Sequence, residues 1–164
     1  MKKLSILLFA LFLVSCEKGE TREELESSLE SALGVIASKS PLGGNDLFFQ
    51  NVSYGNGTRN VLDILMPSEG DSKGVVLFFH GGGFIAGDKA DAYNDLLLET
   101  MESLLVNKIT IVSANYTLIN TPGNKGVISA LEDGTAVINF VQSQLNNLKI
   151  PSNKIVLAGV SAGA

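Results

Sequence analysis

Two segments of this 164-residue chain carry residue types whose spacing could do chemistry. Gly-Val-Ser-Ala-Gly at 159–163 has glycines on both sides of Ser161, which allows a sharp turn that exposes the hydroxyl as a nucleophile. His-Gly-Gly-Gly-Phe at 80–84 has glycines that let the backbone approach a reacting group closely. Backbone N–H groups of such a loop can stabilise an oxyanion, so the two motifs predict attack by Ser161 on a carbonyl carbon.

Both motifs follow predicted strands. The continuous apolar run at 75–79 is typical of a strand buried on both faces, and the run at 155–159 leads to Ser161. Helical spacing at 91–106, a strand at 109–114 and a helix at 129–145 lie between them. This alternation predicts parallel strands joined by two right-handed crossovers.

Two shorter elements precede this unit. Strand-like runs at 47–54 and 61–65 flank the turn signal Gly55-Asn56-Gly57 and predict an antiparallel hairpin. Upstream, Thr21 and Glu24 fit a capping box, and Leu25, Leu29, Leu33 and Ile36 recur at helical spacing. We expect residues 16–45 to be a tether whose helix is a spacer or packs on the domain, and the glycine- and proline-rich segment 40–45 to end it.

On these landmarks the chain resembles the α/β-hydrolase superfamily, in the esterase and lipase branch with an HGGG oxyanion loop. The likeness covers about residues 48–164. Hormone-sensitive-lipase-like esterases and carbohydrate esterases share most of its segments, and Pro122-Gly123-Asn124 is similar to type-B carboxylesterases. The segments, in the family order, are LDI at 62–64, HGGGF at 80–84, GDK at 87–89, NY at 115–116, LED at 131–133 and GVSAG at 159–163.

The resemblance implies an α/β fold in which residues 46–164 form the N-terminal part of an α/β-hydrolase domain. That part would comprise the hairpin and a parallel βαβαβ unit that ends at the nucleophile elbow, a three-layer sandwich incomplete at its C-terminus. Two departures leave the subfamily and its substrates open. Thr117 stands where the resembling families usually carry arginine, and Val160 stands where type-B enzymes usually carry glutamate.

The resemblance also implies the roles of the site residues. Ser161 is the nucleophile, and the backbone N–H groups of Ala162, Gly82 and Gly83 form the oxyanion hole. His80 and Gly81 support the oxyanion loop. Phe84 and Ile85 follow that loop and could line the acyl pocket.

His80 is the only histidine of the chain, yet its position argues against a role as general base. In this superfamily the base follows the nucleophile, whereas His80 precedes Ser161 by 81 residues. We expect its ring to hydrogen-bond to backbone and organise the loop, with direct acid–base work as the alternative. The catalytic acid and base are then expected beyond Ala164.

Other candidate residues have structural interpretations. We expect Asp88 to cap a turn, Asp133 to lie early in a helix and Asp63 to lie in a strand, because all precede the nucleophile in chain order. Tyr116 is expected to pack at a strand end or to form a pocket wall. One histidine and one cysteine cannot build a zinc site, and the sequence predicts no metal and no cofactor.

The first 15 residues are predicted to be a signal peptide, because Lys2 and Lys3 precede an apolar run at 4–14 that is too short to span a bilayer. It ends in Leu13-Val14-Ser15-Cys16, which resembles a bacterial lipobox with Cys16 as the lipidated residue. An ordinary secretory signal with an incidental cysteine is the alternative. Lipidation predicts an exported protein anchored to the membranes of the bacterial cell envelope, with the leaflet undetermined.

Charge argues against a nucleic-acid partner. Without Lys2 and Lys3, 10 of the 12 basic residues remain against 17 acidic ones, a formal charge of −7, and no basic cluster is left to neutralise phosphates. The partner that the resemblance implies is a small-molecule ester, with glycan-linked esters among the candidates.

Three hypotheses follow from the sequence. The first is a lipoprotein esterase that acts on small or carbohydrate-linked esters through a Ser161 acyl-enzyme. The second is a non-catalytic hydrolase relative that binds ligands or partners. The third, compatible with the first, is that the chain is an N-terminal fragment or natural truncation that lacks about 100 further residues and is inactive alone.

Overall fold

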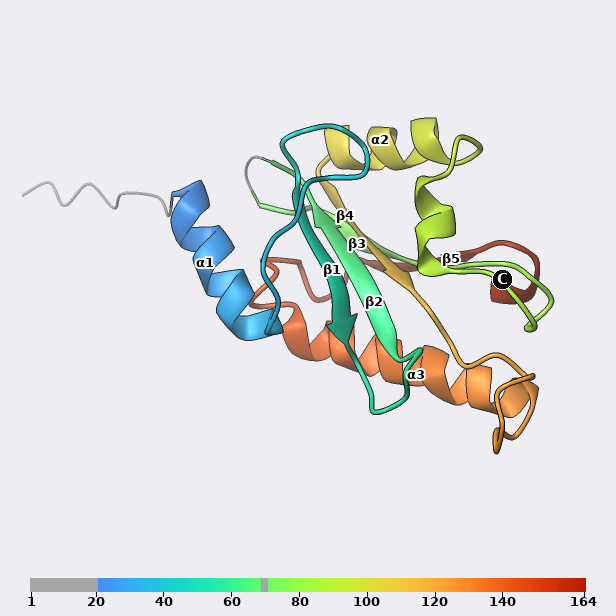
Figure 1. The fold of residues 1–164 in the computed structure, drawn as a ribbon. Coiled ribbons are helices and arrows are strands. Elements are labelled where there is room, and N and C mark those ends of the chain that lie inside the picture. The colour runs from blue at the N-terminus through green and yellow to red at the C-terminus, as the bar shows by residue number, and fades with distance from the viewer. Residues whose placement is uncertain (1–20, 69–70) are drawn as a thin grey trace, which may run out of the picture.

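The computed structural model describes residues 21–68 and 71–164, and it consists of a five-stranded mixed sheet between two helical layers (Figure 1). The strands lie in the order β1-β2-β4-β3-β5. β1 and β2 form an antiparallel hairpin, β2 is antiparallel to β4, and β3 is parallel to both β4 and β5. The expected α/β fold, its hairpin and its parallel unit are thus confirmed. The strands are β1 (Leu47–Ser53), β2 (Val61–Met66), β3 (Gly74–Phe79), β4 (Ile109–Ala114) and β5 (Ile155–Gly159).

Helices cover both faces of the sheet. α1 (Arg22–Leu33) and α3 (Val127–Gln144) pack on one face, where their buried leucine and valine side chains join a cluster with β1, β2 and β3. α2 (Leu98–Val106) and the 3₁₀ helix η1 (Lys89–Tyr93) pack on the other face. Burial of both sheet faces accounts for the near-continuous apolar sequence of β3. Among the described residues, no helix combines the length and hydrophobicity that a bilayer-crossing segment requires.

The helix of the predicted tether, α1, begins as expected and ends earlier. Thr21 and Glu24 form the capping box. The helix ends at Leu33, because Gly34 adopts a left-handed conformation with φ 71° and its N–H bonds the carbonyl of Glu30. The prediction that helical spacing continues to Ile36 is therefore wrong. Because α1 buries Leu29 and Leu33 against the sheet, it packs on the domain, as the sequence allowed.

The helical spacing at 91–106 predicts one continuous helix, and this prediction is wrong in its first half. Asp88 caps the short helix η1, and the side chain of Asn94 then accepts hydrogen bonds from the N–H groups of Leu96 and Leu97. Such side-chain bonds to local backbone compete with helix propagation. The chain therefore turns at Asn94, and α2 begins only at Leu98.

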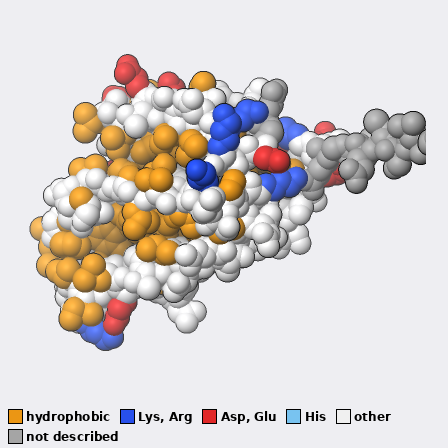
Figure 2. All heavy atoms as spheres, turned by 180° about the vertical axis from the view of Figure 1, so that it is seen from behind, with side chains coloured by type: hydrophobic (Ala, Val, Ile, Leu, Met, Phe, Trp, Pro, Cys, Tyr) orange, Lys and Arg blue, Asp and Glu red, His pale blue; other side chains and the backbone are white. Residues whose placement is uncertain are grey.

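Strand β5 is an edge of the sheet within the described residues, and two of its apolar side chains are exposed. Val156 and Leu157 are each 57% exposed, and Leu131 on α3 is 64% exposed. The view from behind shows hydrophobic side chains gathered across this side of the molecule (Figure 2). An apolar edge strand with unpaired backbone groups favours pairing with another chain.

We expect Val156→Lys to reduce self-association of residues 21–164, because a charge on an edge strand opposes edge-to-edge pairing. Val106→Lys is the matched control, since this valine is 83% exposed on α2, away from the strand, and the variant adds the same charge. Size-exclusion chromatography with light scattering measures the monomer fraction. Equal gains in monomer from both variants would show that net charge and not the β5 edge controls association.

Candidate active site

The serine motif forms a tight turn at the carboxyl end of β5. Ser161 is exposed and has φ 54°, a left-handed conformation that is uncommon for any residue except glycine. Both flanking glycines are required by close packing. A Cβ on Gly159 would collide with the carbonyl oxygen of Gly163, and a Cβ on Gly163 would collide with the carbonyl oxygen of Phe79. This local strain presents the serine hydroxyl above the sheet.

The glycine loop, which begins with the His-Gly-Gly-Gly-Phe motif at 80–84, lies directly beside this turn. It follows β3, the parallel neighbour of β5, so both segments leave the sheet at the same edge. The N–H of Val160 donates to the carbonyl of Phe79 at 3.2 Å, and a Cβ placed on Gly81 would lie 3.5 Å from the Cβ of Ser161. The structure thus brings together the two motifs that are 81 positions apart in the sequence.

The backbone N–H groups of Gly82, Gly83 and Ala162, the residues predicted to form the oxyanion hole, have no hydrogen-bond partner in the described part of the chain. The same is true of the neighbouring N–H groups of Gly81, Phe84 and Ser161. Gly82 and Gly83 have φ 110° and 59°, and Phe84 also has a positive φ, 62°. Because unpaired donors and left-handed residues are both costly, their concentration beside an exposed serine favours a binding role for this backbone.

His80 is fully buried beneath the loop, and both ring nitrogens are engaged away from Ser161. Nδ1 lies 2.7 Å from the carbonyl oxygen of Gly81, and Nε2 lies 3.2 Å from a guanidinium nitrogen of Arg59. Arginine can only donate, so Nε2 accepts and the proton of the neutral ring resides on Nδ1. Burial, with the nearby Arg59 charge, lowers the pKa of His80. The predicted bond between the ring and backbone is present, and no hydrogen bond joins His80 to Ser161 among the described residues.

Tyr116 packs against the other side of this loop. Its ring stacks on His80 with 4.3 Å between centroids, and its hydroxyl donates to the carbonyl of His80 at 2.8 Å. The side chain is buried at the end of β4, where the sequence predicts packing. Tyr116 also lines a cavity beside the serine turn, so it both packs at the strand end and forms part of a pocket wall, the two placements expected from the sequence.

That cavity has a volume of about 480 Å³ and lies between the glycine loop, α3 and the serine turn. Phe79, Phe84 and Tyr116 form its aromatic wall, and Ala162 borders it. Ile85, the second predicted pocket residue, is not among the lining residues and is exposed. We attribute the exposure of the Ile85 side chain to the turn at 82–86, in which the N–H groups of Ile85 and Ala86 both donate to the carbonyl of Gly82.

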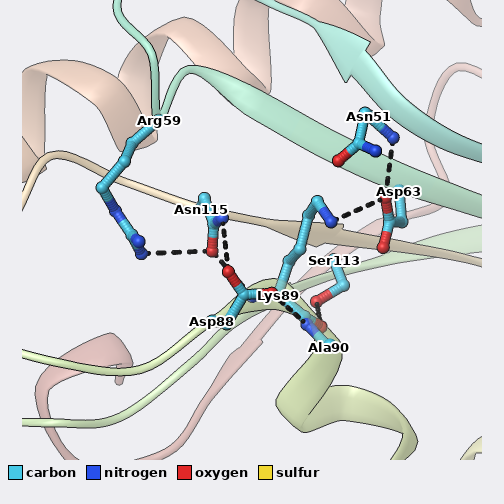
Figure 3. Close-up of polar contacts among 8 residues, drawn as sticks. All are labelled: Asn51, Arg59, Asp63, Asp88, Lys89, Ala90, Ser113 and Asn115. Atoms are coloured by element: carbon cyan, nitrogen blue, oxygen red, sulfur yellow. Dashed lines mark hydrogen bonds and ion pairs between the residues drawn. The ribbon is translucent and has the colours of Figure 1, made fainter.

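The acidic residues considered from sequence are engaged in structural contacts. Asp88 caps η1 and accepts a hydrogen bond from Asn115, and Asp133 accepts one from the N–H of Thr117 at 2.7 Å. Asp63 pairs with the buried ammonium of Lys89 at 3.2 Å (Figure 3). Burial raises the pKa of Asp63, although the Asn51 N–H and Lys89 act in the opposite direction. None of these carboxylates hydrogen-bonds to Ser161 in the described residues.

Arg59 is the residue of this site that sequence reasoning missed. It lies in the hairpin turn before β2, and its guanidinium reaches carbonyl oxygens of Tyr116 and Gly87, each at 2.9 Å. It also contacts the side chains of Asn115 and His80, each at 3.2 Å (Figure 3 shows the Asn115 contact). No motif spacing marks a partner 21 positions from His80, so only the folded hairpin reveals it.

The strand order and the two paired loops are those of the α/β-hydrolase fold. The model of the BD-FAE family matches residues 62–164, more than half of the chain, and the chain belongs to this family.

Named relatives include a receptor and an esterase, both from Arabidopsis thaliana. The gibberellin receptor GID1A is 36% identical over 106 residues, which cover 63% of this chain and 29% of the receptor. The isoprenylcysteine alpha-carbonyl methylesterase ICME is 34% identical over 117 residues, which cover 70% of this chain and 25% of that enzyme. The chain therefore spans less than a third of the length of these relatives.

Solved structures share the fold at lower identity. A thermophilic esterase from Thermogutta terrifontis matches with a TM-score of 0.57 and 23% identity, over 68% of this chain and 40% of that one. A bifunctional GH43-CE protein from Bacteroides eggerthii matches with a TM-score of 0.60 and 23% identity, over 71% of this chain and 15% of that one.

We expect the native His80 ring to titrate below the usual pKa of 6.5, because burial and Arg59 disfavour its charged form. The unfolded chain then binds more protons near pH 6, so the free energy of unfolding should fall as pH drops below about 6.5, with a slope of at most about 1.4 kcal/mol per pH unit. NMR titration measures this pKa without ambiguity, since His80 is the only histidine.

The matched control is the same titration in urea, where the pKa should return to about 6.5. Asp88 also has a lowered pKa, but as a carboxylate its contribution is lost at more acidic pH. A native pKa above 6.5 for His80 would contradict the buried, arginine-facing ring.

Proposed function

We propose that this protein is a serine carboxylic-ester hydrolase whose nucleophile is Ser161. The observation that carries the proposal is the exposed serine at φ 54° beside the unpaired backbone N–H groups of Gly82, Gly83 and Ala162. Esterase family membership supports the same reaction class.

In the proposed reaction the Ser161 hydroxyl attacks the ester carbonyl, a base takes its proton, and the alcohol leaves with a proton returned by that group. The three N–H groups would stabilise the oxyanion that develops, and losing one such donor typically costs about 2.7 to 4 kcal/mol of transition-state stabilisation. His80 does not fit the base role, because its Nε2 lone pair faces Arg59. Water that repeats the attack would release the acid and regenerate Ser161.

We propose small or carbohydrate-linked esters as the substrates. The aromatic wall formed by Phe79, Phe84 and Tyr116 offers an apolar surface for an acyl chain near Ser161. Among similar solved structures, the Thermogutta esterase is described as propionate-bound and another as a carbohydrate esterase from gut microbiota. These descriptions favour short acyl groups and glycan esters as first candidates.

Ligand binding without turnover is the second candidate function. A relative that is 36% identical over 106 residues is a gibberellin receptor, so a similar domain serves in recognition in that protein. The two functions differ in one chemical property: a hydrolase requires an activated Ser161 hydroxyl, and a receptor does not.

We expect a fluorophosphonate probe to label the intact gene product at Ser161 and to leave Ser161→Ala unlabelled, because the probe reacts with an activated serine. Hydrolysis of short p-nitrophenyl esters should fall by at least about 10³-fold in the same variant. Ser53→Ala is the control, since Ser53 is an exposed serine on β1. Binding of an acyl ligand by wild type without labelling would favour the receptor function instead.

We further propose that the protein is exported and anchored to the membranes of a bacterial envelope through lipid on Cys16, which lies outside the described residues. The proposal rests on the lipobox-like segment 13–16 after a charged and apolar leader. Two attached acyl chains would suffice for stable anchoring.

In a bacterial host, Cys16→Ser should abolish incorporation of labelled palmitate and leave uncleaved precursor. Ser15→Ala is the matched control, because it keeps a small residue before the cysteine and should still be lipidated. Palmitate incorporation by Cys16→Ser at the wild-type level would exclude this anchor.

A further inference from the structure

Arg59 joins three parts of the site that the sequence keeps apart. Its Nε donates to the carbonyl of Tyr116, just after β4, and its Nη2 donates to the carbonyl of Gly87, just before η1. Gly87 is the last residue of the loop before Asp88 caps η1. The same Nη2 faces Nε2 of His80, where the loop begins. A single cation from the hairpin therefore holds both ends of the loop 80–87.

The contact with His80 fixes the position of a proton. Arginine has five N–H donors and no acceptor, so Nε2 of His80 must accept and Nδ1 must carry the hydrogen. The Nδ1–H then donates to the carbonyl oxygen of Gly81 at 2.7 Å. The opposite tautomer would place two donors face to face at Arg59 and two acceptors face to face at Gly81.

The orientation of the Gly81 carbonyl in turn orients the next N–H. The chain has no cis peptide among its described residues, and in a trans peptide the C=O and the following N–H point in opposite directions. Because the Gly81 oxygen is held towards His80, with the Tyr116 hydroxyl 3.4 Å away, the N–H of Gly82 points away from the buried ring. That N–H is one of the unpaired donors beside Ser161.

We propose that Arg59 is a positioning residue of the active site, which sets the tautomer of His80 and thereby aims the Gly82 N–H at the oxyanion. The catalytic consequence of this inference rests on the proposed hydrolase function. The effect of Arg59 on the His80 tautomer does not depend on that function. Arg59 acts through His80 and Gly81 and does not itself touch the substrate.

The test uses the intact gene product labelled with ¹⁵N-histidine, and the His80 ring is assigned by its contacts with the stacked Tyr116 ring. The wild type should show a protonated Nδ1 and an unprotonated Nε2. Arg59→Met keeps an unbranched stem for packing but has no donor, so only the Gly81 carbonyl still favours the Nδ1–H tautomer and the fraction of molecules with a protonated Nε2 should rise measurably. The pKa of His80 should rise in this variant, because Asp88 and Asp91 remain nearby while the opposing guanidinium is gone.

The kinetic readout separates positioning from substrate binding. Arg59→Met should lower kcat towards p-nitrophenyl acetate by about 10- to 100-fold with KM changed less than about threefold, since the aimed donor acts mainly in the transition state. Arg59→Lys retains a cationic donor and should preserve the Nδ1–H tautomer and recover part of kcat. Lys125→Ala removes an exposed cation that pairs with Glu132 on α3, and it should change neither readout.

An unchanged tautomer in folded Arg59→Met overturns the proposal, whatever happens to the rate. If Arg59→Met fails to fold, loss of the Nδ1–H tautomer in folded Arg59→Lys overturns it, and retention supports it. If the wild type hydrolyses no ester, the proposed hydrolase function fails, while the tautomer comparison still decides whether Arg59 sets the ring of His80.

Discussion

Strands β3 and β5 run side by side with Phe79 paired to Gly159, and this register brings the glycine loop and the serine turn to one edge of the sheet. The two backbones then approach so closely that a Cβ on Gly163 would collide with the carbonyl oxygen of Phe79. Gly163 must therefore be a glycine because a larger residue would collide with the end of β3, and not only because it lies in a tight turn. The geometry of the site follows from this contact, because it sets the serine turn directly against the start of the glycine loop.

A polar network below the loop supplies the second constraint. Asn115, at the end of β4, accepts the N–H of Lys89 at 2.7 Å and donates to Asp88, so one amide ties the sheet to the start of η1. Lys89 turns inward to the buried Asp63, and the hydroxyl of Ser113 bonds the Lys89 carbonyl (Figure 3). Breaking a buried pair by removing one partner leaves an uncompensated charge, at a cost of about 3–5 kcal/mol. The network thus holds the segment after the loop in one arrangement, and the loop has little freedom to relax away from Ser161.

Sequence reasoning succeeded where the pattern is local. The hairpin around Gly55-Asn56-Gly57, the capping box of α1 and the buried strand β3 all have signals within a few residues, and all are present. It failed where two local signals compete: apolar spacing favours a helix through 91–106, but the Asn94 side chain bonds the following backbone and starts a new segment. The early end of α1 has the same origin, since a left-handed Gly34 outweighs the apolar Ile36.

The sequence by itself predicted the class of chemistry, because the two glycine motifs have few uses other than a tight turn and a backbone anion site, and their order along predicted strands places them at one sheet edge. It also argued against His80 as a base through chain order. Only the tertiary structure decided what His80 contacts, since its partner Arg59 comes from a hairpin 21 positions away and its stacking partner Tyr116, 36 positions away, follows strand β4. Hydrogen bonds between such distant residues depend on strand order and side-chain direction, and no spacing in the sequence encodes either.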